Sequence, residues 1–267
     1  MKFTIDGRTA YAYTGGKTFD SALPGIVFIH GAMHDHGCWI QQSRYLAHHG
    51  HAVLAVDLPG HGRSEGPPLS VVDAGRWVAE LVAASGLKRV VLAGHSMGSL
   101  IALEAAARLG EQVNQLFMVG TAYPMKVSAQ LLELAQKDPL KAIDFVNNLS
   151  YSTLAAKPSH PGPGFWLHGG SRSLMRRTQR GWTGGNLFHF DFSACDAYAG
   201  AEAAAPAMRC PVTLILAQAD QMTQTRAAAP LITLLKPKVV TLKSGHNLMA
   251  EVPDGVLDAM LGTLRAG

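Results

Sequence analysis

A five-residue turn, Gly94-His95-Ser96-Met97-Gly98, constrains the fold of this chain more than any other stretch. A mostly apolar run precedes it at 89–93, and a helix-like segment follows it at 99–108. A side chain at 94 or 98 would clash where a strand bends tightly into a helix, whereas glycine tolerates the backbone angles of such a bend. The turn therefore predicts a strand, a sharp bend with Ser96 at its apex, and a helix whose free N–H groups favour negative charge.

Short apolar runs typical of buried strands alternate with helical patterns along most of the chain. Strands are expected at 3–5, 10–13, 26–29, 52–56, 90–93, 116–119, 212–217 and 239–242. Helices are expected at 39–49, 71–86, 97–109, 226–235 and 252–265. Strands that are apolar throughout and separated by helices predict an α/β fold, with a mostly parallel eight-stranded sheet and helices on both faces. Right-handed crossovers then bring the C-terminal ends of the strands to one edge, where ligands bind.

The alternation breaks between about 121 and 206. This stretch has helical pieces at 127–137 and 140–149, a Pro/Gly-rich bend at 158–164, and a set of clustered aromatic residues. The aromatic residues are Phe165, Trp166, Trp182, Phe188, Phe190 and Phe192. We therefore expect 1–121 and 206–267 to form the core and 122–205, here called the lid segment, to form an inserted helical lid.

Composition excludes several classes of protein. With 267 residues, 48% hydrophobic and 16% charged, the chain can bury a sizeable core and is not typical of disorder. The net charge is +4 without a long Lys/Arg run, which predicts no nucleic-acid partner. No run of about 20 apolar residues could span a membrane, and the N-terminus has no apolar core of signal-peptide length.

Cysteine usage predicts a reducing compartment. Cys38, Cys195 and Cys210 are odd in number and widely spaced, so they form neither a disulfide framework nor a CxxC metal pair. We expect a cytoplasmic protein, monomeric or a small homo-oligomer, that acts on a small molecule.

Two further residues follow strand-like runs and so should lie at the same sheet edge as Ser96. Asp220 comes after the run at 212–217, and His246 after the run at 239–242. A serine hydroxyl becomes a strong nucleophile when a base removes its proton and a third group orients that base. We expect Ser96, His246 and Asp220 in these three roles.

The acid of the triad has an alternative candidate, and the oxyanion of the reaction needs donors of its own. Asp57, which follows the strand-like run at 52–56, is the alternative acid. An oxyanion hole would need two backbone N–H donors, for which Met97 and Ala32 are the candidates. Ala32 stands just after Gly31, which allows a tight turn behind the strand at 26–29.

Taken together, these motifs resemble the α/β-hydrolase superfamily, in particular its lid-bearing serine esterases and carbon–carbon bond hydrolases. The matching segments are Phe28-Ile29-His30-Gly31, Val56-Asp57-Leu58-Pro59-Gly60-His61-Gly62-Arg63-Ser64, the turn at 94–98, Asp220 and Gly245-His246. The resemblance implies a Ser96–Asp220–His246 triad in the chain order Ser, Asp, His. Related epoxide hydrolases and haloalkane dehalogenases carry aspartate at the turn, so Ser96 argues against both. The loop at 32–36 is more polar than the glycine-rich loop of many relatives.

The resemblance implies a serine hydrolase without cofactor that cleaves carboxylic esters of small to medium, mostly apolar substrates through an acyl-enzyme. One alternative is hydrolysis of a carbon–carbon bond in a ring-cleavage dienoate, and others are lactone or thioester hydrolysis. A non-catalytic ligand receptor on the same fold is the alternative from a different class.

The expected contacts with substrate are Met33, Trp39, Trp166 and Arg176. Arg172, Arg176 and Arg180 follow one another at i, i+4 and i+8, and so share a helix face. That face is either solvated or a clamp for a substrate carboxylate.

The sequence predicts no metal site. The histidine- and aspartate-rich stretch at 34–36 (His-Asp-His) supplies no full ligand shell, and it predicts a polar loop beside the site instead.

Overall fold

The computed structural model describes residues 1–152 and 166–264, in which eight strands form one sheet. The strands are β1 (Lys2–Ile5), β2 (Arg8–Tyr13), β3 (Gly25–Ile29), β4 (Ala52–Val56), β5 (Val90–His95), β6 (Val113–Val119), β7 (Val212–Ala217) and β8 (Lys238–Leu242). Their order across the sheet is β1-β2-β4-β3-β5-β6-β7-β8. β1 and β2 pair antiparallel with their neighbours, and the other strands are parallel. The prediction of a mostly parallel eight-stranded sheet is confirmed.

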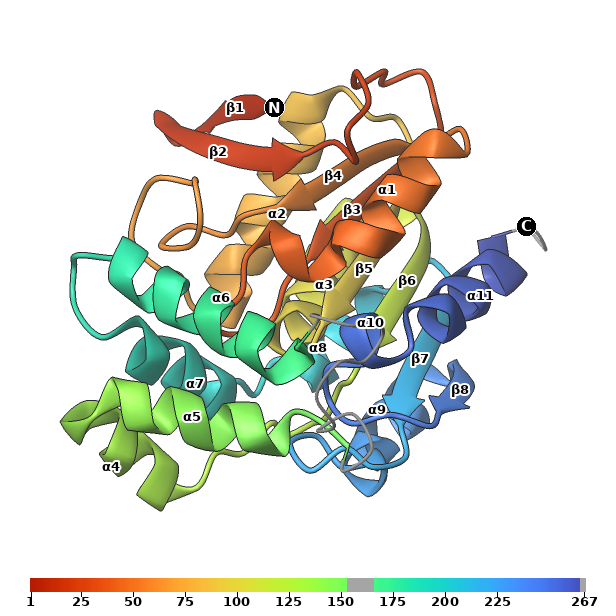
Figure 1. Ribbon diagram of the computed structural model, residues 1–267. Coiled ribbons are helices and arrows are strands. Elements are labelled where there is room, and N and C mark those ends of the chain that lie inside the picture. The colour runs from red at the N-terminus through yellow and green to blue at the C-terminus, as the bar shows by residue number, and fades with distance from the viewer. Residues whose placement is uncertain (153–165, 265–267) are drawn as a thin grey trace.

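Helices cover both faces of the sheet (Figure 1). One face carries α2 (Val71–Ser85) and α3 (Met97–Leu109), and the other carries α1 (Ile40–His48) and α11 (Pro253–Leu264). Two further helices, α9 (Ala229–Leu235) and α10 (Leu248–Glu251), flank β8 in the chain.

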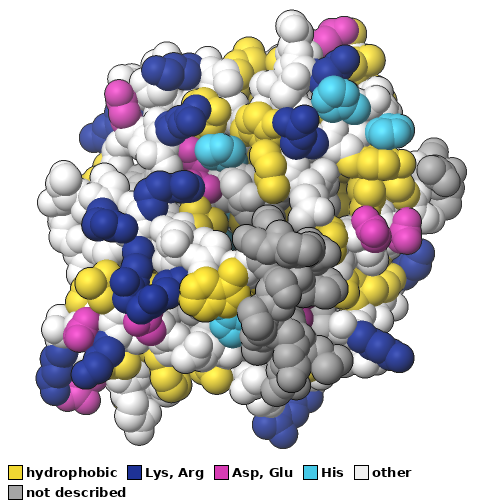
Figure 2. All heavy atoms as spheres, in the orientation of Figure 1, with side chains coloured by type: hydrophobic (Ala, Val, Ile, Leu, Met, Phe, Trp, Pro, Cys, Tyr) yellow, Lys and Arg dark blue, Asp and Glu magenta, His cyan; other side chains and the backbone are white. Residues whose placement is uncertain are grey.

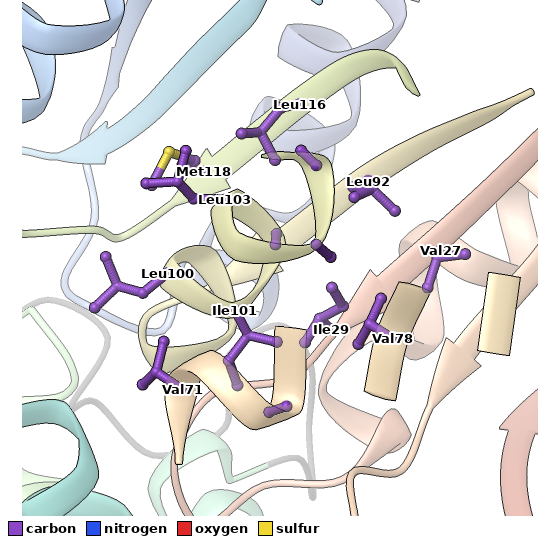
Figure 3. Packing of buried hydrophobic residues seen from close by; sticks show 14 of the residues in the cluster. Val27, Ile29, Val71, Val78, Leu92, Leu100, Ile101, Leu103, Leu116 and Met118 are labelled. Atoms are coloured by element: carbon purple, nitrogen blue, oxygen red, sulfur yellow. The ribbon is translucent and has the colours of Figure 1, made fainter. Parts of the chain in front are cut away.

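The central strands are buried on both faces because side chains alternate along a strand. Val27 and Ile29 of β3 pack toward α2 and α3, whereas Ile26 and Phe28 pack in the opposite layer. In Figure 3, Ile101 of α3 points toward α2, and Ile29 of β3 lies beside it. The helix that follows Ser96 therefore rests on a closely packed layer, which fixes its N-terminus.

Local sequence sets the ends of α2. Ser70 accepts a hydrogen bond from the Asp73 N–H and so caps the first turn. Gly86 ends the helix with φ +76°, a left-handed conformation that suits glycine.

A separate group of helices occupies the lid segment, between β6 and β7. It comprises α4 (Ala129–Lys137), α5 (Pro139–Leu149), α6 (Leu167–Gly181), α7 (Leu187–Ala197) and α8 (Ala201–Ala204). Within the described part of 122–205 there is no strand. Figure 1 shows α4 to α7 gathered beyond one end of the sheet. The predicted bend at 158–164 and Phe165 lie outside the described residues.

The lid segment has its own apolar core. Its buried residues include Ile143, Met175, Leu187 and Phe188, and Met33 joins them from residues 1–121 and 206–264, here called the sheet domain. The rings of Phe188 and Phe192 stack with centroids 4.2 Å apart. The helices are therefore held both to one another and to the loop after β3.

In the ranges 1–152 and 166–264, no helix has the length and apolar character needed to cross a bilayer.

Candidate active site

Ser96 lies at the apex of a tight turn between β5 and α3, with φ +52° and ψ −121°. A residue other than glycine in such a conformation is strained by about 1–3 kcal/mol and persists only where its surroundings impose it. A Cβ on Gly94 would overlap the Gly98 carbonyl, and a Cβ on Gly98 would overlap the His30 carbonyl. Both glycines are therefore required by contact between backbones, as the sequence predicts.

The N–H of Met97 is free of the helix ladder because Met97 is the first residue of α3. It lies directly after Ser96, at the positive end of the helix dipole.

Asp220 and His246 are joined by a hydrogen bond of 2.8 Å between Asp220 Oδ2 and His246 Nδ1. The Asp220 carboxylate is buried and also accepts from the N–H groups of Met222 (2.8 Å) and Thr223 (2.7 Å). Burial alone would raise the pKa of Asp220, but the neighbouring His246 and the Thr223 hydrogen bonds hold that pKa well below its usual range. Asp220 is therefore a fixed negative charge next to the imidazole.

Thr223 is a residue of this site that sequence reasoning missed. Its Oγ1 donates to Asp220 Oδ2 at 2.8 Å and lies 3.1 Å from His246 Nδ1. The available signal was its place three residues after Asp220, where a hydroxyl can turn back onto the carboxylate.

His95 holds the backbone of His246 in place. Its Nε2 donates to the His246 carbonyl at 3.0 Å, and the two rings lie 4.8 Å apart between centroids. Burial, reinforced by the nearby His246, lowers the pKa of His95 well below its usual value. His95 is a neutral support beneath the turn.

The loop after β3 passes directly against Ser96. A Cβ on Gly31 would lie 3.2 Å from Ser96 Cβ. A turn closes when the His34 N–H donates to the Gly31 carbonyl (3.3 Å), and His34 Nδ1 donates to the Ala32 carbonyl (2.8 Å). Ala32 is thereby fixed close to the serine.

One cavity brings Ala32, Ser96, Thr223 and His246 together. Its volume is about 60 Å³, room for a few water-sized groups. Apolar side chains line most of the rest: Met125, Val127, Val146, Met175, Phe192, Cys195 and Met222. All of these except Met222 belong to the lid segment.

Two predicted substrate contacts are core residues instead. Trp39 is completely buried, packs on Phe28 at 4.9 Å between centroids, and donates from Nε1 to the Ile29 carbonyl (3.2 Å). Met33 is also completely buried, and its side chain packs among the lid-segment helices. Neither lines the cavity of Ser96, because the loop directs both away from it into apolar layers.

The other two predicted contacts also lie outside the cavity. Trp166 is 56% exposed. Arg176 Nη2 lies 3.0 Å from Asp144 Oδ2, and Arg172 makes two bonds to the same carboxylate at 2.7 and 2.8 Å. Hydrogen bonding from Arg172 and the charges of both arginines lower the pKa of Asp144. Figure 2 shows basic side chains gathered on this side of the molecule with acidic ones among them. Arg172 and Arg176 thus pair α6 with α5, whereas Arg180 donates from Nε to the Arg176 carbonyl at 3.2 Å.

Asp35, His36 and Asp57 place one potential metal-ligand atom each within 4.8 Å of one another. Asp57, however, accepts from the His36 N–H (2.8 Å), His36 Nδ1 (2.7 Å) and the Arg63 N–H (2.9 Å). Asp35 accepts from Arg177 Nη2 at 2.6 Å. The protein's own donors occupy these carboxylates, which fits the polar loop. Asp57, the alternative acid, holds His36 and not His246.

Comparison with known proteins agrees with this architecture. The profile described as "Alpha/beta hydrolase family" matches residues 26–259. The chain belongs to the alpha/beta hydrolase family. The match includes the turn at 94–98 and both Asp220 and His246.

Individual relatives match shorter stretches of the chain than the family profile does. The chain is 29% identical over 138 residues to (E)-2-((N-methylformamido)methylene)succinate hydrolase of Acinetobacter baylyi, covering 51% of this chain and 50% of that protein. It is 37% identical over 99 residues to pimeloyl-(acyl-carrier protein) methyl ester esterase of Chromobacterium violaceum, covering 37% of each. The matched stretch thus spans half or less of the length of either relative.

Solved structures extend the likeness in fold to the whole chain. A thermophilic esterase superposes with a TM-score of 0.81 at 22% identity, covering 100% of this chain and 97% of that one. An enol-lactonase from Burkholderia xenovorans superposes with a TM-score of 0.77 at 18% identity, covering 99% and 100%.

Proposed function

We propose that this protein is a serine hydrolase that cleaves carboxylic esters of small to medium, mostly apolar acyl groups through an acyl-enzyme. The observation that carries the proposal is the hydrogen-bonded Asp220–His246 pair on the same small cavity as Ser96. Hydrolases and esterases among the relatives, at low identity, support the reaction class.

The chemistry follows from which ring nitrogen is engaged. His246 Nδ1 donates to Asp220, so Nε2 is the nitrogen that accepts a proton. As Ser96 Oγ bonds to the ester carbonyl carbon, its proton passes to Nε2. The tetrahedral intermediate then breaks its bond to the alcohol oxygen, which leaves with that proton. Water attacks the acyl-enzyme in the same way, which releases the acid and restores the serine hydroxyl.

The oxyanion of the intermediate would be bound by the N–H groups of Ala32 and Met97. Both donors are backbone groups held by local structure, and loss of one such donor costs about 10²–10³ in rate in comparable enzymes.

Residues 122–205 act in this proposal as a lid that selects the acyl group. Their side chains form most of an apolar wall around about 60 Å³, which favours short acyl chains over long ones. Excluding water from such a cavity also strengthens the charge interactions around Ser96.

The dienoate alternative relied on lid arginines that bind a carboxylate. Arg172 and Arg176 already share the Asp144 carboxylate, so they are not free to bind a substrate carboxylate. Among the described residues that line the cavity, Lys126 is the one lysine or arginine, and its side chain is 66% exposed.

The test combines covalent labelling with a substrate series. Wild type should react stoichiometrically with a fluorophosphonate at Ser96, and should cleave p-nitrophenyl acetate and butyrate faster than the octanoate. The variants Ser96→Ala and His246→Ala should lose most turnover, and Ser96→Ala should remain unlabelled. A folded wild type that is neither labelled nor active on any ester would support the receptor alternative.

A matched pair of esters, one with a remote carboxylate and one neutral, tests the discarded clamp. Arg172→Ala and Arg176→Ala should treat the pair as wild type does. A strong preference for the carboxylate that either variant abolishes would favour hydrolysis of a ring-cleavage dienoate over ester hydrolysis.

A further inference from the structure

A buried carboxylate of the lid segment reaches the loop that carries the proposed oxyanion donor. Asp191, on α7, is 2% exposed, and its Oδ2 accepts from the Met33 N–H at 2.8 Å. The same oxygen lies 2.9 Å from His61 Nε2, in the loop after β4. Asp191 thus binds two segments of the sheet domain that are remote from it in the chain.

Met33 has a backbone conformation that needs support. Its φ is +62°, in the left-handed region that residues other than glycine seldom adopt. It occupies the third position of the turn that the His34 N–H closes onto the Gly31 carbonyl, where a positive φ is characteristic of a type II turn. The turn would change type if the peptide between Ala32 and Met33 flipped.

That peptide is held at both ends. Its carbonyl, on Ala32, accepts from His34 Nδ1 at 2.8 Å, and its N–H, on Met33, donates to Asp191. The Ala32 N–H belongs to the preceding peptide, Gly31–Ala32, which is the first peptide of the same turn. Asp191 therefore supplies the only contact to this peptide from the lid segment among the described hydrogen bonds.

His61 holds the Asp191 carboxylate in place from the other side. Its Nδ1 faces the Pro59 carbonyl at 3.0 Å while Nε2 faces Asp191, so both nitrogens meet acceptors and the doubly protonated ring satisfies both. Burial alone would lower the pKa of His61, but the charge and hydrogen bond of Asp191, the Pro59 carbonyl and the more distant Asp57 raise it.

We propose that Asp191 is a positioning residue: through the Met33 N–H it holds the turn at 31–34 in the conformation in which the Ala32 N–H, in the first peptide of that turn, can bind the oxyanion. The oxyanion site is then complete only while α7 lies against the sheet domain. This inference rests on the proposed hydrolase function.

A second contact between the lid segment and the loop after β3 provides a matched control. Arg177, on α6, bonds Asp35 in the same loop at 2.6 Å, but its side chain is 68% exposed. Solvent screens the exposed Arg177 end of this pair, although Asp35 itself is buried, and the pair does not touch the Ala32–Met33 peptide.

The experiment compares four variants on an ester that wild type cleaves, with circular dichroism to establish folding. Because the oxyanion forms only after substrate binds, Asp191→Ala should lower kcat about tenfold or more while KM changes less than about twofold. Asp191→Asn keeps an acceptor for the Met33 N–H and should recover part of kcat. His61→Asn breaks the ion pair but leaves that acceptor, so its kcat should exceed that of Asp191→Ala. Arg177→Ala should stay near wild type.

Equal kcat values for Asp191→Ala and His61→Asn, both folded, would overturn the inference, because the ion pair would then have only a structural role.

If Asp191→Ala fails to fold, the double variant Asp191→Ala/His61→Ala removes the unpaired buried charge and is compared with His61→Ala alone. A double variant as active as His61→Ala overturns the inference, and a lower kcat supports it. Labelling and turnover of wild type test the proposed function separately, and their failure would overturn both proposals.

Discussion

Replacing Asp220 by asparagine should disable the proposed base while leaving its surroundings nearly unchanged. The amide oxygen can still accept from the N–H groups of Met222 and Thr223, as Asp220 Oδ1 does. The amide NH₂ would then take the place of Oδ2, opposite His246 Nδ1. An NH₂ group donates, so Nδ1 must become the acceptor and the ring proton must move to Nε2. The nitrogen that should take the Ser96 proton would already carry one.

The expected loss follows from this exchange of tautomers. The corresponding substitution in a serine protease triad lowers kcat by about 10⁴. At about 1.36 kcal/mol for each tenfold change, this corresponds to a barrier roughly 5.4 kcal/mol higher. KM should change much less, because the cavity wall and the oxyanion donors are untouched.

Stability provides a second measurement on the same variant. The folded-state pKa of Asp220 lies below its unfolded value, so its charge adds stability above about pH 4, and this is lost as the pH falls through the folded pKa. The difference in unfolding free energy between wild type and Asp220→Asn should therefore be constant near neutral pH and shrink below about pH 4.

The assay is p-nitrophenyl acetate hydrolysis with circular dichroism, and Asp57→Asn is the matched control. Asp57 is equally buried but bonds His36 and Arg63, so its variant should retain kcat wherever it folds. Near wild-type kcat in Asp220→Asn, together with a large loss in a folded Asp57→Asn, would refute the assignment of the acid.

Three further predictions address the turn, the cavity and the ion pair. Gly98→Ala places a Cβ against the His30 carbonyl and should cost about 1–3 kcal/mol, measured as a melting temperature lower by roughly 2–4 °C per kcal/mol. Met175→Ala shortens a side chain of the cavity wall and so enlarges the cavity, which should raise kcat/KM for octanoate relative to acetate esters. An unchanged ratio would mean that Met175 does not limit chain length. The raised pKa of His61 means that its pair with Asp191 stabilises the fold fully below about pH 6.5 and less as the pH rises through the folded value. Urea unfolding should therefore show the advantage of wild type over His61→Asn shrinking as the pH rises above about 6.5, and a constant difference would contradict the charged pair.

The sequence predicted the fold because its signals are local. Apolar strands and the glycine-flanked turn at 94–98 can each be recognised from a few neighbouring residues. Parallel strands joined by right-handed crossovers then bring their C-terminal ends to one edge of the sheet. That rule alone placed Asp220 and His246 near each other, although the chain separates them by 26 positions.

Contacts made by the lid segment could not be predicted in this way. The spacing of the arginines on α6 predicted that they share a face, but the choice between solvent, substrate and Asp144 depends on how α5 packs. Trp39 illustrates the same difficulty, because an aromatic residue after a site loop has the same sequence signature whether it lines a cavity or fills a core. The bond from Asp191 to Met33 joins residues 158 positions apart and has no local signal.

The bond between Asp191 and Met33 also limits how freely this chain could exchange residues 122–205 for the corresponding segment of a relative. Residues 122–205 are inserted between β6 and β7, which are neighbours in the sheet. They therefore resemble a module that could be replaced to change substrate preference. A chimera built on this sheet domain would retain the buried, positively charged His61 and the left-handed Met33. The His61 Nε2 and the Met33 N–H would both need a carboxylate to accept from them. A donor segment that brings none would leave them unsatisfied. Lid engineering on this scaffold should therefore graft the cavity-lining positions and retain α7, so that selectivity changes while the loop beside Ser96 keeps its anchor.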